Sequence, residues 1–190
     1  MKLLFRLFWL ILTQSRRSRC SITGPVDTEL RVYPNDLDIF MHVNNGVYLT
    51  YADLGRTDMM LRSDVFNLIR ENGWYPVVAA ETITFKKSLK LGQRFTMTTR
   101  ILGWDDRAIY MEQVFTRSGT LIARALIDAR FLSRAGGKVS TAELYELVGV
   151  SGESPALPDS LTLWIESNKA ANLGAPAAPR PTPEPAPPLG

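Results

Sequence analysis

The sequence has few of the side chains that build metal sites and disulfides. Its 190 residues include one cysteine, Cys20, and one histidine, His42. A single cysteine excludes a disulfide within the chain and agrees with a reducing compartment. One cysteine with one histidine also excludes the spacing of a zinc site. We therefore expect a cytoplasmic protein with no structural metal and no cofactor.

A hydrophobic run long enough to span a membrane is also missing. Residues 3–12 are strongly apolar apart from Arg6, but a spanning helix needs about 20 such residues. No small-residue cleavage site follows, as it would in a signal peptide. Two interpretations remain open: an interfacial helix whose aromatic side chains enter the headgroup zone, or a helix packed on the domain. We predict peripheral membrane contact through residues 3–12.

The excess of positive charge is small and local. The net charge is +3, from 22 Lys and Arg residues against 19 Asp and Glu residues. Much of the excess lies in Arg16, Arg17 and Arg19, directly after the apolar run. A basic cluster at one terminus does not make a nucleic-acid-binding face, so we expect no nucleic-acid partner.

The composition divides the chain into three segments. Residues 1–25 form an apolar and basic leader, residues 26–149 a folded domain, and residues 150–190 a short helix with a Pro/Ala-rich tail. The apolar share of 45% and charged share of 22% are ordinary for a globular protein. The tail has too little apolar surface to order itself. On composition, the leader and tail are expected to be dispensable for folding.

Within the domain, hydrophobic periodicity predicts one strand, a long helix, a short helix and four further strands. Asn44 or Asn45 suits the N-cap of the long helix, and Ala52 and Gly55 would let a sheet approach it closely. Short links between the last four strands predict antiparallel neighbours. The pattern therefore predicts an α+β fold, a five-stranded antiparallel sheet wrapped around a central helix, with an edge that a second copy would pair. The predicted elements are residues 29–33, 46–61, 64–71, 77–89, 95–102, 108–116 and 121–132.

Polar side chains concentrate just before the long helix, in the stretch PNDLDIFMHVNNGVYLTY. Asp36 and Asp38 come first, and His42, Asn44 and Asn45 follow. A helix N-terminus offers unpaired N–H groups and a positive dipole end, which can hold a carbonyl oxygen as it gains negative charge. A carboxylate facing the carbonyl carbon can attack it or deprotonate a water that does. These residues could form an acyl-transfer site without a metal.

The segment DLDIFMHVNNGVYLTYADLGR closely resembles the motif of hotdog-fold thioesterases of the 4-hydroxybenzoyl-CoA thioesterase type. That motif has D-x-D, then G-H-V-N-N or a variant, then a tyrosine-containing helix ending in E-x-x-R. The resemblance covers residues 27–133 and is nearest to superfamily members with an apolar leader. It implies a hotdog fold, a homodimer or tetramer with active sites at the subunit interface, and an acyl-CoA substrate from lipid metabolism.

The resemblance also implies residue roles. Asp38 matches the catalytic aspartate, as nucleophile or general base, and the backbone amide near Asn45 matches the group that polarises the thioester carbonyl. Asp53 and Arg56 match the acidic and basic residues of the helix. With their neighbours, the expected set is Asp38, His42 and Asn45 as catalytic residues, and Asn44, Tyr48, Asp53 and Arg56 as substrate-binding residues.

The segment departs from the motif at Phe40 and Met41, where many members have a glycine before the histidine. Related acyl-ACP thioesterases have an asparagine at the position of Phe40, so an aspartate-based mechanism is implied instead. Asp36 is expected to form a turn, and Glu81, in an apolar strand, would be a further base if buried. A non-catalytic hotdog protein that binds acyl-CoA or a partner remains the alternative.

Overall fold

The computed structural model describes residues 2–13 and 16–172. Residues up to Leu157 belong to one compact unit, and a second unit begins at Pro158. The elements are α1 (Lys2–Thr13), β1 (Val26–Arg31), the 3-10 helix η2 (Pro34–Asp36), α2 (Asn45–Arg62), α3 (Val65–Glu71), β2 (Trp74–Phe85), β3 (Arg94–Trp104), β4 (Ile109–Arg117), β5 (Thr120–Ser133), β6 (Lys138–Val139), α4 (Thr141–Leu147) and α5 (Asp159–Asn172).

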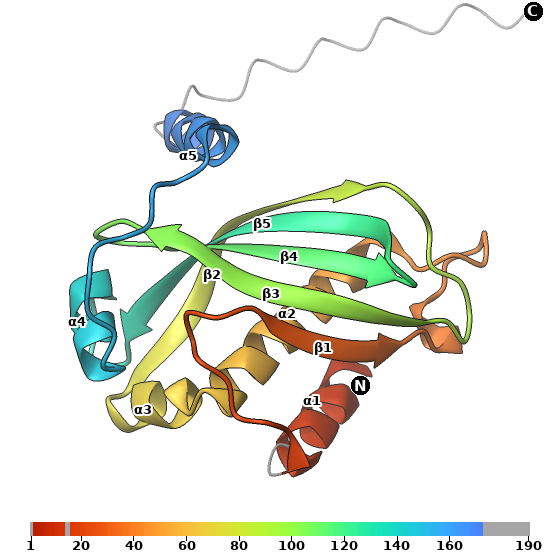
Figure 1. Ribbon diagram of the computed structural model, residues 1–190, viewed down its shortest axis with the longest axis horizontal. Helices are drawn as coiled ribbons and strands as arrows, with labels where there is room; N and C mark the ends of the chain where they lie inside the picture. The colour runs from red at the N-terminus through yellow and green to blue at the C-terminus, as the bar shows by residue number, and fades with distance from the viewer. Residues whose placement is uncertain (1, 14–15, 173–190) are drawn as a thin grey trace, which may run out of the picture. The chain divides into compact units, whose positions relative to one another are not determined.

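An antiparallel sheet curls around the central helix α2 (Figure 1). The strand order is β1-β3-β4-β5-β2, with the short β6 paired to β5. Ala52 is fully buried, and a Cβ on Gly55 would lie 2.2 Å from the Met97 side chain. Both small residues therefore face the sheet at close range, as predicted. The predicted α+β class and the sheet wrapped around a helix are confirmed.

The prediction that the last four strands pair in succession is wrong for the first of them. β2 pairs with β5, and β3 pairs with β1 and β4. The predicted strand 77–89 ran too far, because β2 ends at Phe85. The connection to β3 is therefore residues 86–93, long enough to carry the chain from one edge of the sheet to β3 near the other.

The N-terminal helix α1 packs on the domain. Leu10 is 4% exposed and belongs to the core, and Leu7 packs against it. Figure 1 places α1 beside β1, the sheet edge opposite β2. Because Leu10 contributes to the core, we expect removal of residues 1–25 to lower the stability of the domain, contrary to the expectation from composition.

The other face of α1 carries large apolar side chains that are mostly exposed. Their exposed fractions are 70% for Phe5, 62% for Phe8, 56% for Trp9 and 59% for Leu12. The helix is thus packed on the domain through one face and leaves an aromatic face uncovered. Among residues 2–13 and 16–172, no helix is both long and apolar enough to cross a membrane.

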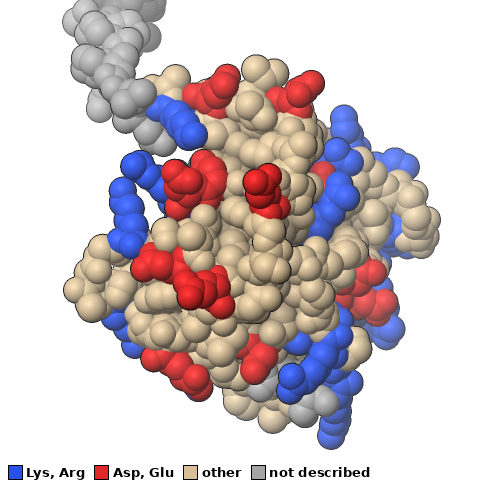
Figure 2. Space-filling view, turned by 60° about the vertical axis from the view of Figure 1, so that its left-hand side comes forward, with Lys and Arg blue, Asp and Glu red and all other residues tan. Residues whose placement is uncertain are grey.

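The C-terminal segment is described as far as residue 172. Helix α5 (Asp159–Asn172) lies in the segment 150–190, where a short helix was predicted. The Pro/Ala-rich tail predicted after it lies outside the described residues. The predicted segment boundaries at residues 25 and 149 remain predictions. On the face shown in Figure 2, acidic and basic side chains are interspersed.

Candidate functional site

Asp38 lies in a tight hairpin-like loop between η2 and α2. Leu37 and Val43 form an isolated β-bridge, and the Asp38 N–H donates to the His42 carbonyl at 2.8 Å. The Asp38 Oδ1 accepts hydrogen bonds from the N–H groups of Phe40 at 2.8 Å and His42 at 3.2 Å. No described residue donates to Oδ2. One carboxylate oxygen therefore fixes the turn, while the other is available for chemistry.

The tip of this loop is apolar and exposed. Ile39, Phe40 and Met41 are 89%, 74% and 60% exposed. Met41 has a φ of 60°, in the left-handed region that favours glycine. This backbone explains why many proteins with the motif have a glycine before the histidine. The present chain keeps an exposed methionine there at a conformational cost.

A Met41→Gly variant is expected to be more stable than the wild type by about 1 kcal/mol, because glycine adopts this φ without strain. The Met41 side chain is 60% exposed, so removing it loses little buried apolar surface. Urea denaturation measures the change in the free energy of unfolding. Ser118, with a φ of 48° in the turn between β4 and β5, provides the matched control as Ser118→Gly. If Ser118→Gly stabilises and Met41→Gly does not, Met41 makes contacts that offset its strain.

The amino end of α2 presents one free amide beside this loop. The Asn44 side chain caps the helix, accepting from the Gly46 N–H at 2.9 Å, and its carbonyl accepts from the Val47 N–H at 2.9 Å. The Asn45 N–H makes no hydrogen bond to another described residue. Asn44 and Asn45 are both exposed. The free amide is thus the one that the resemblance implies for polarising the carbonyl.

His42 and Tyr48 support this end of the helix in different ways. His42 is partly buried and its backbone bridges to Lys90, while its imidazole forms no hydrogen bond with the described part of the chain. Tyr48 is 2% exposed, its hydroxyl accepts from the Leu89 N–H at 3.3 Å, and burial raises its pKa. In a single copy, Tyr48 therefore anchors α2 to the connection after β2 and lies in the core.

A second polar cluster surrounds Arg56 in the middle of α2. Arg56 is 9% exposed. It pairs with Asp53, donates to the Gln113 Oε1 at 2.9 Å, and lies 3.9 Å from the Glu81 carboxylate. Desolvation raises the pKa of Glu81, against the opposing effect of Arg56. Glu81 stands out in the sequence as a carboxylate in an apolar strand, whereas nothing in the pattern marks Gln113 on β4, which is fully buried.

Within one copy of the chain, the Asp38 loop and the Asn45 amide lie far from the cluster around Arg56. Asp53 lies eight residues beyond Asn45, about 12 Å along the helix axis at about 1.5 Å per residue. An apolar cavity of about 150 Å³ adjoins Asp53 and Arg56, between α2 and the sheet. Asp38 does not line it. Its apolar lining includes Met59, Met60, Ile101, Ile109, Met111, Phe131, Leu144 and Tyr145.

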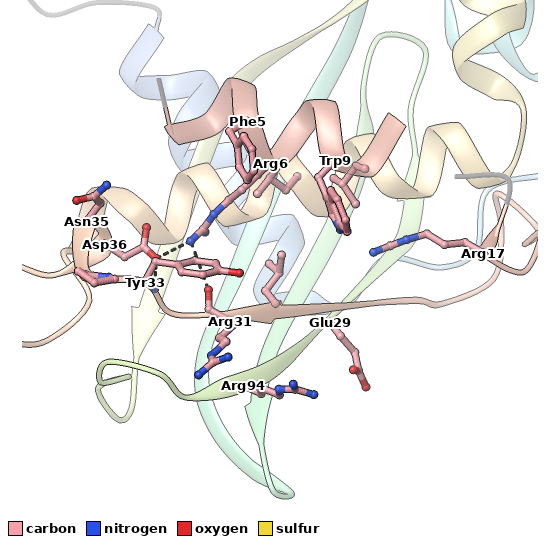
Figure 3. A pocket seen from close by; sticks show the side chains of 14 residues that line it. Phe5, Arg6, Trp9, Arg17, Glu29, Arg31, Tyr33, Asn35, Asp36 and Arg94 are labelled. Carbon is pink, nitrogen blue, oxygen red and sulfur yellow. Dashed lines mark hydrogen bonds and ion pairs between the residues drawn. The ribbon is translucent and has the colours of Figure 1, made fainter. Parts of the chain in front are cut away.

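Asp36 has a role beyond the predicted turn. It is 3% exposed, and its Oδ2 accepts from the Tyr33 N–H at 2.7 Å, which is the turn contact. The same oxygen forms an ion pair with Arg6 of α1 at 2.6 Å. Arg6 and Asp36 lie at one end of an 830 Å³ groove between α1 and β1 (Figure 3). The sequence does not reveal this pair, because Arg6 is a single charge within an apolar run, 30 residues before Asp36.

Comparisons with known proteins agree with the resemblance in the motif. The sequence profile of the thioesterase-like superfamily matches residues 32–165. Protein THEM6 of Xenopus laevis is 34% identical over 143 residues, which are 74% of this chain and 67% of that protein. The long-chain acyl-CoA thioesterase FadM of Escherichia coli is 28% identical over 104 residues, 54% of this chain and 79% of that protein. Among solved structures, the probable thioesterase YbaW of Escherichia coli is similar with a TM-score of 0.60 and 25% identity, over 64% of this chain and 95% of that one.

Proposed function

Because the chain belongs to the thioesterase-like superfamily, with a hotdog fold, and is a thioester hydrolase, we propose that it hydrolyses acyl-CoA at Asp38. The proposal is supported by two groups in one short segment: a carboxylate oxygen of Asp38 that no described residue bonds, and the first amide of the helix that follows, which is also free. Asp38 Oδ1 is held by two backbone N–H groups, so Oδ2 has a fixed direction. The Asn45 N–H lies at the positive end of the α2 dipole, where a developing oxyanion is stabilised.

Hydrolysis at this site needs no metal or cofactor. In the general-base route, Asp38 takes a proton from water as the water oxygen bonds to the thioester carbonyl carbon. The carbonyl oxygen gains negative charge beside the Asn45 amide, and the C–S bond then breaks to release CoA thiolate, which takes up a proton. In the nucleophilic route, the Asp38 carboxylate attacks the carbonyl carbon and the C–S bond breaks, releasing CoA thiolate and leaving an acyl anhydride that water then cleaves. Both routes require the Asp38 carboxylate.

We propose a homodimer in which the β2 edges pair. β2 is the edge strand of the sheet, twelve residues long, and Tyr75, Val78 and Phe85 on it are 38–40% exposed. A long, apolar edge of this kind is a template for pairing. A two-fold axis through β2 would set the two α2 helices antiparallel. The amino end of each helix, with Asp38, would then face the later turns of the other.

This arrangement would complete the site from two copies. The apolar cavity beside Asp53 and Arg56 supplies a chamber for the acyl group, since such pockets are apolar with few polar groups. A cavity of 150 Å³ holds a ligand about the size of benzene. We therefore expect the cavity to hold part of a long acyl chain or all of a short one. Initial rates of CoA release over acyl-CoA chain lengths test the proposal, and no release from any length would contradict it.

We further propose that α1 brings the enzyme to a lipid surface. Its aromatic face is uncovered. Arg16 and Arg19, which follow the helix in the sequence, are exposed. This combination is typical of interfacial helices. The double variant Phe8→Ser, Trp9→Ser is expected to lose most of its co-sedimentation with vesicles of phosphatidylcholine and phosphatidylserine. Leu163→Ser, exposed on α5, is the control. Equal sedimentation of all three proteins would contradict the contact.

A further inference from the structure

Arg6 of α1 enters the domain at the base of the Asp38 loop. Its guanidinium Nη2 lies 2.6 Å from the Asp36 carboxylate and donates to the Arg31 carbonyl at 3.3 Å. The side chain is only 13% exposed. It lies over the rings of Tyr33 and Tyr51, with centroid distances of 5.1 Å and 4.9 Å, within the range of cation–π attraction. Figure 3 shows Arg6 reaching from α1 toward Asp36, Arg31 and Tyr33.

The Asp36 carboxylate needs this partner. A buried carboxylate is costly unless it is paired and hydrogen-bonded, and Asp36 is 3% exposed. Its Oδ2 receives the Tyr33 N–H and the Arg6 guanidinium together. Removing Arg6 would leave a buried charge without its cation, so Asp36 would move towards solvent.

Asp36 in turn connects the Asp38 loop with the amino end of α2. It precedes Asp38 by two residues, and its carbonyl accepts from the Asn44 N–H at 2.9 Å. Asn44 is the N-cap of α2 and comes directly before Asn45. The Asp38 loop is therefore closed at its base by the residue that Arg6 fixes. A shift of Asp36 would displace the carboxylate and the helix amide relative to each other.

We infer that Arg6 is a positioning residue for thioester hydrolysis, acting through Asp36 on Asp38 and the Asn45 amide. The inference rests on the proposed function. A misplacement of about 1 Å at a reacting group can cost about 10²-fold in rate. We expect Arg6→Gln to lower kcat by about 10- to 100-fold with little change in KM, since Arg6 does not touch the substrate. Arg6→Lys keeps the charge but not the planar group that lies on the tyrosine rings, so its kcat should be intermediate.

Leu10→Ala is the matched control, because it weakens the packing of the same helix without touching Asp36. Its kcat per folded molecule should stay within about threefold of the wild type.

A double-mutant cycle tests whether Arg6 acts through Asp36. It compares Arg6→Gln, Asp36→Asn and the double variant Arg6→Gln, Asp36→Asn. If Arg6 acts through Asp36, the double variant loses no more activity than the worse single variant. Additive losses would overturn the inference.

If Arg6→Gln folds poorly, amide hydrogen exchange in Arg6→Lys provides a second test. The N–H groups of Phe40 and His42, bonded to Asp38 Oδ1, should exchange faster in Arg6→Lys than in Leu10→Ala. Equal exchange in both, or a wild-type kcat in Arg6→Gln, overturns the inference while Asp38→Asn remains inactive. A fully active Asp38→Asn would instead overturn the proposed function, so the two failures are distinguishable.

Discussion

A Val78→Asp variant is expected to be monomeric at micromolar concentration and to lose most of its hydrolytic activity. Val78 is 40% exposed near the middle of the unpaired edge of β2 and also borders the apolar cavity. In a two-fold antiparallel pairing, this stretch meets its own copy, so one substitution brings two carboxylates close together. Like charges placed opposite each other destabilise a strand pair. Sedimentation velocity gives the oligomeric state, and CoA release gives the activity.

Leu91→Asp is the control for a new exposed charge, because Leu91 is 49% exposed and lies outside β2. It should remain a dimer with wild-type activity. A Val78→Asp protein that is still dimeric would show that the copies do not pair through β2. A monomeric Val78→Asp protein with wild-type activity would show that each copy carries a complete site.

The central helix could be predicted from the sequence because its signals are local. Asn44 caps it through its own side chain, and the small residues Ala52 and Gly55 mark the face that the sheet covers. The helix α4, which the hydrophobic periodicity did not predict, has a local signal as well. Ser140 and Glu143 form a capping box, the pattern that marks a helix start.

The strand order could not be read from local pattern. Alternation identifies a strand but does not name its partner, and the pairing depends on where each connection begins. The buried Leu89 extended the apparent alternation of β2 beyond Phe85. The predicted connection to β3 was therefore shorter than the observed one, residues 86–93. Its true length lets β2 pair with β5.

The candidate site was predicted in part. The motif located Asp38 and the helix amide near Asn45, because both lie in one short segment. It could not locate Arg6, which lies 30 residues before Asp36 in the sequence and meets it only through the packing of α1. Nor could it show that Asp53 and Arg56 lie well along the helix from Asp38, a separation that makes a second copy necessary in our account.

An Asp38→Asn variant is expected to lose hydrolytic rate by about 10²- to 10⁴-fold, the usual contribution of a general acid–base group. Asparagine keeps the size of the side chain, and its oxygen can still accept from the Phe40 and His42 N–H groups. The turn and the melting temperature should therefore be nearly unchanged. The amide cannot act as a base or a nucleophile, so the loss should appear in kcat.

Two further variants set the scale for this loss. Asp106→Asn removes a carboxylate at an exposed turn position outside the loop and should keep wild-type activity. His42→Ala should cost less than Asp38→Asn, because the imidazole makes no hydrogen bond with the described residues and its backbone contacts survive the substitution.

The most direct test of the account is the rate of CoA thiol release by the full chain on its best acyl-CoA, measured for the wild type and Asp38→Asn at equal folded concentration. The account predicts measurable turnover by the wild type and a loss of at least about 10²-fold in the variant, with similar melting curves. Near-wild-type release by Asp38→Asn would contradict it, and Glu81 and Asp53 would then be the carboxylates to change next.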